Sequence, residues 1–245
     1  MTLLLSPHLD DAAFSLGAYA AGLALADVRV LVATVFTKSV PQPRGFALAC
    51  QTDKGYGPDV DYMAMRRAED VAASEVLGTQ VAHWGFAEAP HRGYGSPAAL
   101  FAGVKGGAAE EKLVVQIAER LEQTLLEHRP LDVFYPLGIG DHVDHEVVIR
   151  AVERVRPDHH NVRWRQWYDQ PYVARNGVTR SADAEEIAWP ADSEALALKW
   201  RACAAYRSQV AYQFWGAVGE ERPADADGVA RVAALLGRRE WVVPG

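Results

Sequence analysis

The chain has 245 residues, of which 49% are apolar, and it carries a net charge of −7 at neutral pH. A chain of this length and composition can bury a substantial core, so a disordered protein is excluded. The negative charge argues against electrostatic binding of nucleic acid or anionic lipid. The two cysteines, Cys50 and Cys203, are too far apart in sequence to suggest a disulfide scaffold or a cysteine-based zinc cluster.

The first residues lack the features of a targeting segment. Residues 1–5 lead directly into a polar motif, without the basic region and long apolar region of a signal peptide. No uncharged apolar stretch reaches the roughly 18 residues of a membrane span. We therefore expect a cytoplasmic protein with no membrane partner.

Residues 3–36 predict a strand, a helix and a second strand. Residues 3–5 are an apolar run that stops at Ser6-Pro7, residues 11–26 are rich in Ala and Leu, and residues 28–36 form a β-branched apolar run. This order is typical of a right-handed parallel βαβ unit.

The alternation of helices and strands continues to the end of the chain. Further helices are expected at 61–77, 110–128, 143–155 and 193–208, and further strands at 80–84, 132–135, 163–168, 172–178 and 240–243. Two long irregular stretches, 37–61 and 85–107, are expected to form the rim of a substrate site. We predict one domain over residues 1–245, a Rossmann-like α/β sandwich of three layers with a mostly parallel sheet.

Two short motifs of metal-binding residue types each follow a predicted strand. The first is Pro7-His8-Leu9-Asp10-Asp11, and the second is Asp141-His142-Val143-Asp144-His145. Ligands of open α/β sheets bind at the carboxyl ends of the strands, so both motifs are expected at the same edge of the sheet. A single metal site built from both is therefore predicted there.

The spacing within the motifs indicates which residues bind the metal. His8 and Asp11 are three residues apart, a spacing that places side chains on one face of a helical turn. With His145 they supply two imidazoles and one carboxylate, which is a ligand set of hydrolytic zinc sites. Zinc is the expected metal, although Fe²⁺ and Co²⁺ also occupy such sites.

The remaining polar residues of the motifs are candidates for acid–base chemistry. Asp10 adjoins a ligand and suits a general base that takes the proton of the attacking water; its alternative role is a helix N-cap. His142 could protonate the leaving amine or stabilise the oxyanion. Asp144 could orient His142, or cap the following helix.

Two other kinds of site share some of these features with a hydrolase. Two histidines and one carboxylate also describe non-haem iron oxygenases, but those sites usually lie on all-β folds. A dinucleotide site is disfavoured because Gly138 and Gly140 lack the third glycine of the fingerprint, Val143 standing in its place.

The order of the motifs resembles that of the LmbE-like (PIG-L) zinc-dependent de-N-acetylases. That family has a His-x-Asp-Asp motif, here His8–Asp11, and a later His-x-x-His motif, here His142–His145. Arg66-Arg67-Ala68-Glu69 resembles the Arg-x-x-Glu helix of the family, and a weaker similarity covers residues 84–92. The resemblance implies His8, Asp11 and His145 as zinc ligands, Asp10 as the base and His142 as the residue that stabilises the tetrahedral intermediate. Arg66 and Arg92 are the expected substrate-binding residues.

The resemblance also implies the reaction. We expect a metal-dependent hydrolase that removes an N-acetyl group from an N-acetylglucosamine-type sugar or glycosylated small molecule. Glu88 stands where the family pattern suggests Asp, a difference that bears on the substrate. The alternative functions are an amidase for a larger acyl group and a non-catalytic sugar- or metal-binding protein. The expected partner is a small amino-sugar substrate, and a homo-oligomer is compatible with the sequence.

Overall fold

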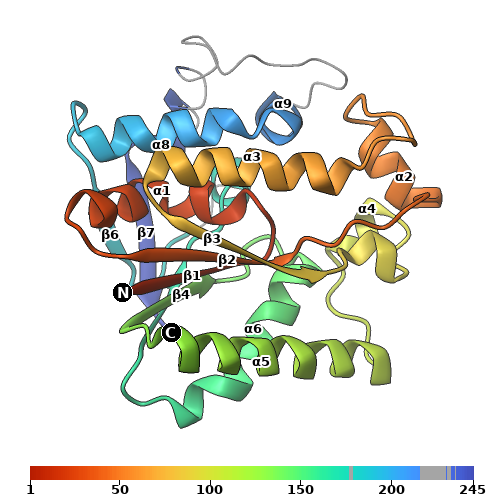
Figure 1. Ribbon diagram of the computed structural model, residues 1–245, viewed down its shortest axis with the longest axis horizontal. Helices are drawn as coiled ribbons and strands as arrows, with labels where there is room; N and C mark the ends of the chain where they lie inside the picture. Colours follow the sequence, from red (N-terminus) through yellow and green to blue (C-terminus); the bar gives the residue numbers. More distant parts are fainter. Residues whose placement is uncertain (177–178, 216–229, 231–232, 235) are drawn as a thin grey trace.

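The computed structural model describes residues 1–176, 179–215, 230, 233–234 and 236–245. Within them, seven strands form one sheet in the order β3-β2-β1-β4-β5-β7-β6. Figure 1 shows the sheet between a layer that contains α1, α3 and α8 and a layer that contains α5 and α6. The predicted three-layer α/β sandwich is confirmed.

Five neighbouring strands run parallel, and the last two strands at one side of the sheet pair antiparallel, β7 with β5 and β6 with β7. The parallel strands are β1 (Thr2–Ser6), β2 (Val30–Phe36), β3 (Gln80–Phe86), β4 (Asp132–Pro136) and β5 (Arg163–Trp167), and the other two are β6 (Glu185–Ala188) and β7 (Arg239–Pro244). Leu3 of β1 pairs with Leu31 and Val133 of its two neighbours. The carboxyl ends of the parallel strands therefore lie together along one end of the sheet.

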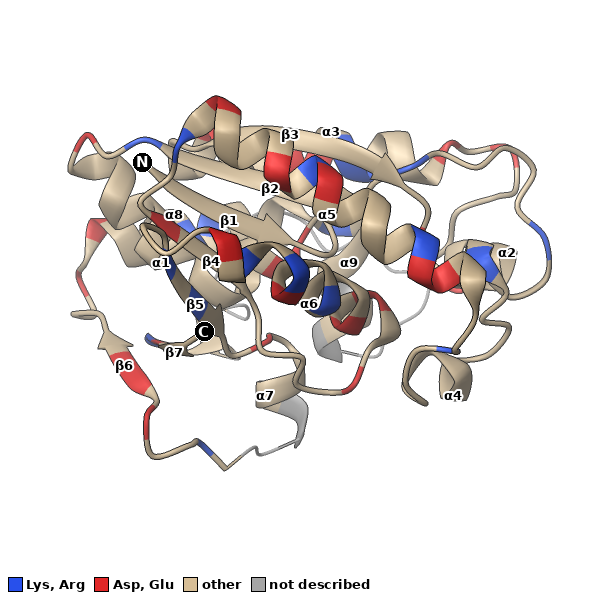
Figure 2. Cartoon of the chain, turned by 90° about the horizontal axis from the view of Figure 1, so that it is seen from below, with Lys and Arg blue, Asp and Glu red and all other residues tan. Residues whose placement is uncertain are grey.

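Helices of very different lengths cover the two faces of the sheet. The longer ones are α1 (Asp11–Leu25), α3 (Tyr62–Leu77), α5 (Ala108–His128), α6 (Val143–Val155) and α8 (Glu194–Ala205), and the shorter ones are α2 (Gly45–Thr52), α4 (Pro97–Leu100), α7 (Tyr172–Asn176) and α9 (Arg207–Trp215). Figure 2 shows acidic and basic residues interspersed along α5 and α6. In the described residues no helix is both long and apolar enough to cross a membrane.

The central strand β1 is buried on both faces, as a strand inside a parallel sheet must be. Leu3 and Leu5 pack in the core formed with α5 and α6, whereas Leu4 packs in the core formed with α1. All three side chains are at most 1% exposed. Burying each of them contributes about 2 kcal/mol, so β1 is a rigid base for the residues that follow it.

A buried ion pair supports a kink in α1. The backbone at Leu16 leaves the helical region, with φ −132° and ψ 25°. The carboxylate of Glu240 in β7 accepts hydrogen bonds from the N–H groups of Ala18 and Tyr19, at 2.9 and 2.8 Å. Lys199 of α8 donates to the same carboxylate at 2.7 Å. The kinked helix, α8 and the C-terminal strand are thereby joined.

The prediction of a strand over 172–178 is wrong for its described part, because Tyr172–Asn176 is the helix α7; residues 177–178 lie outside the described residues. The edge of β5 where such a strand would pair is occupied by β7, since Gln166 faces Val243. The Val173 N–H instead donates to the carbonyl of Asp169, which begins a helical turn.

Further elements depart from the sequence prediction. The irregular stretches 37–61 and 85–107 contain α2 and α4, respectively, and the charged edge strand β6 was not expected. The helix predicted at 193–208 is divided into α8 and α9 at Tyr206, which has ψ 61° and whose hydroxyl donates to Asp70. A tertiary hydrogen bond, which sequence periodicity does not reveal, accompanies this break.

Candidate metal centre and active site

The two polar motifs lie side by side at the carboxyl edge of the sheet. The first follows the end of β1 at Ser6, and the second follows β4, which ends at Pro136. Because β1 and β4 are parallel neighbours, the motifs meet: the ring centroids of His8 and His145 are 5.3 Å apart. His142 lies 4.9 Å from His8 on the same measure.

Four potential ligands converge at this place. One nitrogen from each of His8, His142 and His145 lies within 4.8 Å of the others. The Asp11 carboxylate lies between two of these rings, with Oδ2 3.2 Å from Nδ1 of His8 and 3.2 Å from Nε2 of His145. The residues present therefore suit a metal bound by nitrogen and oxygen.

His145 is held in the form that can bind a metal. Its Nδ1–H donates to Oδ1 of Asp169 at 2.7 Å, and both side chains are at most 1% exposed. In the neutral ring this leaves the lone pair on Nε2, which faces Oδ2 of Asp11 at 3.2 Å and makes no hydrogen bond among the described residues. An imidazole backed by a carboxylate is a recurring arrangement in metal sites.

Asp169 is a functional candidate that the sequence prediction missed. Its second oxygen, Oδ2, accepts hydrogen bonds from the N–H groups of Gly138 and Ile139, at 2.9 and 3.0 Å. One carboxylate thus holds both His145 and the loop that leads into the second motif. Its position just after β5 was the available signal, because β5 ends at the same edge as β1 and β4.

His8 has a similar carboxylate partner in Asp144. The Nε2 atom of His8 lies 3.0 Å from Oδ2 of Asp144, which also accepts from the Ala89 N–H. If that nitrogen carries a proton, Nδ1 of His8 is left facing Asp11. The side chain of Asp144 therefore contacts His8, and only its main-chain N–H contacts His142.

The charges of the site favour a cation. Despite burial, the Asp11 and Asp169 carboxylates raise the pKa of His145 to about 9. Burial likewise opposes charge on His8, but Asp11 and Asp144 raise its pKa well above the ordinary value. Without a metal, the carboxylates therefore favour the protonated, positively charged forms of His8 and His145.

Asp10 lies beside the predicted ligands and turns toward a different partner. It is 3% exposed, and its Oδ1 lies 3.6 Å from a guanidinium nitrogen of Arg66. Burial raises the pKa of Asp10, and the nearby guanidinium opposes that shift. Arg66 in turn donates to Glu88 at 2.5 Å. A buried carboxylate of raised pKa is a suitable proton acceptor.

His142 is neutral in this environment. Burial and the neighbouring His8 lower the pKa of His142 to about 3. Its Nδ1 accepts the Asp144 N–H at 3.2 Å and so caps α6. The proton of the neutral ring is therefore assigned to Nε2, which makes this atom a hydrogen-bond donor.

Arg92 lies behind Asp144 and is not among the residues that line the cavity. Its guanidinium donates to Asp144 Oδ1 at 2.5 Å and to both oxygens of Glu110, each at 3.2 Å. A further bond reaches the carbonyl of Ala87. Arg66, by contrast, lines the cavity. The structure thus brings the predicted metal-site residues and Arg66 together but keeps Arg92 outside that group.

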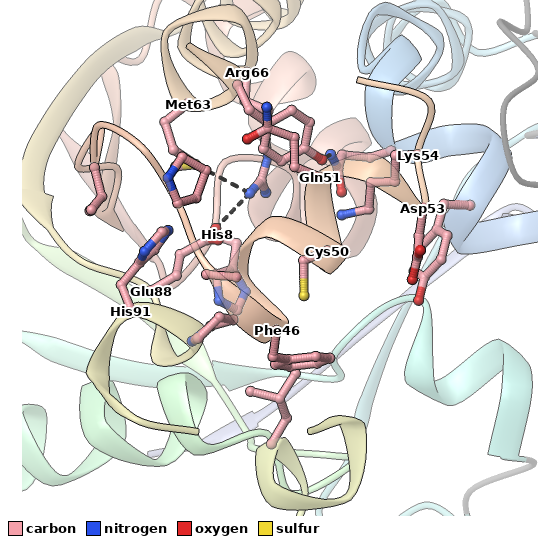
Figure 3. Close-up of a pocket in the computed structure, with 18 of the residues that line it drawn as sticks. His8, Phe46, Cys50, Gln51, Asp53, Lys54, Met63, Arg66, Glu88 and His91 are labelled. Atoms are coloured by element: carbon pink, nitrogen blue, oxygen red, sulfur yellow. Dashed lines mark hydrogen bonds and ion pairs between the residues drawn. The ribbon is translucent and has the colours of Figure 1, made fainter. Parts of the chain in front are cut away.

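A cavity of about 590 Å³ opens from the predicted metal site. The stretches predicted to form its rim supply much of its lining, including Phe101 beside α4 and Phe46 of α2, which Figure 3 shows. Val60, Phe101 and Tyr212 line it although they are 40–44% exposed, so large apolar and aromatic side chains stand at its mouth. Cavities of this size hold molecules considerably larger than one sugar.

Comparison with known proteins agrees with this geometry. Residues 3–156 match the family described as PIG-L, GlcNAc-PI de-N-acetylase. A 2'-N-acetylparomamine deacetylase from Streptomyces fradiae is 32% identical over 157 residues, which are 62% of this chain. The match spans 50% of that relative.

Solved structures match over nearly the whole chain. A deacetylase–bog complex from the teicoplanin biosynthesis pathway has a TM-score of 0.78 and 29% identity, covering 100% of this chain and 98% of that one. The zinc-inhibited form of the teicoplanin deacetylase Orf2 has a TM-score of 0.77 and 28% identity, covering 99% and 97%.

Proposed function

The chain belongs to the PIG-L (GlcNAc-PI de-N-acetylase) family, and from that premise we propose that it is a metal-dependent N-deacetylase. Its substrate would be a glycosylated small molecule that carries an N-acetylated amino sugar. The observation that carries the proposal is the convergence of His8, Asp11 and His145 beside the buried carboxylate of Asp10. The size of the cavity and the large exposed side chains that line it support a glycoside over a free monosaccharide.

The proposed ligands are His8, Asp11 and His145, and zinc is the proposed metal. A divalent metal bound there would polarise the amide carbonyl and make an attacking water more acidic. The Nε2 atom of buried His145, which faces Asp11 and makes no hydrogen bond among the described residues, supports this ligand set. His142 also lies close enough to be a ligand, but its Nδ1 is occupied by the cap of α6, and we assign its Nε2–H to the substrate.

The chain's own residues would move the protons. Asp10 accepts a proton from the water as its oxygen attacks the acetyl carbonyl carbon. The Nε2–H of His142 donates a hydrogen bond to the oxygen that becomes negative. When the C–N bond breaks, Asp10 returns the proton to the leaving nitrogen, so that water and amide become acetate and a free amine.

The charged neighbours would keep these groups in place. Arg66 lines the cavity and lies close to Asp10, so it would both orient the base and contact the sugar. Asp144 would hold His8 through Nε2, and Arg92 would act through Asp144 instead of touching the substrate. The similarity to the paromamine and teicoplanin-pathway deacetylases supports a glycosylated small molecule as substrate.

The test is amine release by metal-stripped protein, with and without stoichiometric zinc. The substrates would be N-acetylglucosamine and a panel of its glycosides, with N-propionyl and N-benzoyl analogues to probe a larger acyl group. Zinc-dependent release is expected, with a preference for glycosides. Asp10→Asn should bind zinc normally and lose activity by about 100-fold or more. Full activity in that variant would exclude Asp10 as the base, and absence of zinc binding would exclude the mechanism.

A further inference from the structure

The cavity reaches a second cation, the ammonium of Lys54, which the proposed mechanism does not use. Lys54 lies in the connection between α2 and α3, and its side chain extends into the cavity from the wall that also carries Arg66 and Cys50 (Figure 3). The ammonium nitrogen lies 5.3 Å from the ring centroid of Tyr62 and 5.0 Å from that of Tyr212.

The two cations of the cavity differ in their partners. Arg66 is paired with Glu88 and Asp10. Lys54 forms no ion pair with a carboxylate in the described part of the chain, and its neighbours are two tyrosine rings. Although burial opposes its charge, the contact with the Tyr62 hydroxyl and the field of Glu88 raise the pKa of Lys54, so the ammonium is charged at neutral pH.

We propose that Lys54, Tyr62 and Tyr212 form a subsite for an anionic oxygen group, such as a carboxylate, on the non-reacting part of the substrate. This inference rests on the proposed deacetylase function and narrows its substrate class to acidic glycosides. A carboxylate at Lys54 would gain a charge-assisted hydrogen bond in a place already partly shielded from water.

The charges near Lys54 are compatible with an anion. Asp53 and Asp59 also line the cavity, but both are exposed, so water and salt screen them. The faces of Tyr62 and Tyr212 are already used by the ammonium, and the edges of aromatic rings are their electropositive part. An anion that approaches Lys54 from the cavity would meet Glu88, whose field reaches the ammonium, only as part of its ion pair with Arg66.

A purely structural role for Lys54 makes a different prediction. As a packing contact between the α2–α3 connection and α9, Lys54 would affect stability and all substrates alike. As an anion subsite, it would discriminate between substrates that differ only in charge. The discriminating pair is 4-carboxyphenyl and 4-carbamoylphenyl N-acetyl-β-glucosaminide, since the carboxylate and the carboxamide have nearly the same shape.

The experiment compares the ratio of kcat/KM for the acid to that for the amide in three proteins. They are the unmodified chain, Lys54→Met and the matched control Lys105→Met. Lys105 also lies on a tyrosine ring, with its nitrogen 4.6 Å from the Tyr94 centroid, but it is not part of the cavity lining. The ratio should fall about tenfold in Lys54→Met, recover largely in Lys54→Arg and stay constant in Lys105→Met.

A binding measurement separates this inference from the proposed function. Calorimetric titration of metal-free protein with the two glycosides should give the same tenfold change in the ratio of Kd values. If binding discriminates through Lys54 while no protein releases amine, the subsite stands and the deacetylase function fails. A carboxylate that binds no more tightly than the amide, or a ratio that Lys54→Met leaves unchanged, overturns the subsite.

Discussion

Asp169→Asn should weaken metal binding while leaving the fold intact. The carboxylate serves two kinds of donor, the Nδ1–H of His145 on Oδ1 and the N–H groups of Gly138 and Ile139 on Oδ2. Asparagine has only one oxygen for these donors. Either arrangement of its amide must therefore disrupt one side.

The two arrangements have different costs. With the amide oxygen toward the backbone, its NH₂ group meets Nδ1 of His145, and the ring must move its proton to Nε2, where it blocks metal binding. With the amide reversed, Gly138 and Ile139 lose their acceptor in a buried place, which costs about 1–3 kcal/mol for each donor. Replacing such a partner of a metal ligand typically lowers metal affinity by about 10–100-fold, which is the expected range.

Competition with a chromophoric zinc chelator measures this affinity, and thermal unfolding measures the stability of the metal-free protein. Asp70→Asn is the matched control, because Asp70 is also 1% exposed and contacts His83 and Tyr206 instead of a proposed ligand. The control should lose stability and keep its zinc affinity. Zinc affinity in Asp169→Asn equal to that of the unmodified chain would refute the reasoning.

Two further predictions concern stability. Folding raises the pKa of His145 to about 9 from an ordinary value near 6.5, so the stability contributed by the protonated ring is complete below pH 6.5 and disappears as the pH rises through 9. Metal-free protein should therefore lose up to about 3 kcal/mol of unfolding free energy across this window. A denaturant midpoint that does not change with pH there would contradict the assignment. Glu240→Gln should lower the free energy of unfolding by about 3–5 kcal/mol, because it leaves the buried Lys199 ammonium without a counter-charge. Zinc affinity should not change. Chemical unfolding measures the stability, and chelator competition measures the zinc affinity.

Most of the fold and the proximity of the two motifs were predictable from local patterns. Apolar runs such as residues 3–5 mark buried strands, and parallel strands bring their carboxyl ends together, so His8 and His145 could be expected near each other. Such reasoning needs only the order of elements along the chain. It does not require knowledge of which side chains touch.

The errors arise where a distant segment decides the outcome. Residues 172–176 read as a strand, but β7, from the end of the chain, occupies the edge of β5 and leaves them no partner. Asp169 belongs to neither sequence motif, and its role depends on contacts with both His145 and the loop after β4. Lys54 lies in a stretch expected to be irregular, and only the packing of α9 brings Tyr212 to it.

The charges of the site restrict where an acidic substrate can place its anion. Around the proposed metal, the carboxylates outnumber the guanidinium groups: the former are Asp10, Asp11, Glu88, Asp144 and Asp169, and the latter are Arg66 and Arg92. This excess favours a divalent cation, and it would repel an anionic group near the scissile amide. An acidic substituent should therefore lie away from the reacting end, near Lys54, whose ammonium has no carboxylate partner among the described residues. The excess of carboxylates at the metal end and the ammonium of Lys54 at the other end thus give the two ends of the cavity opposite charge preferences.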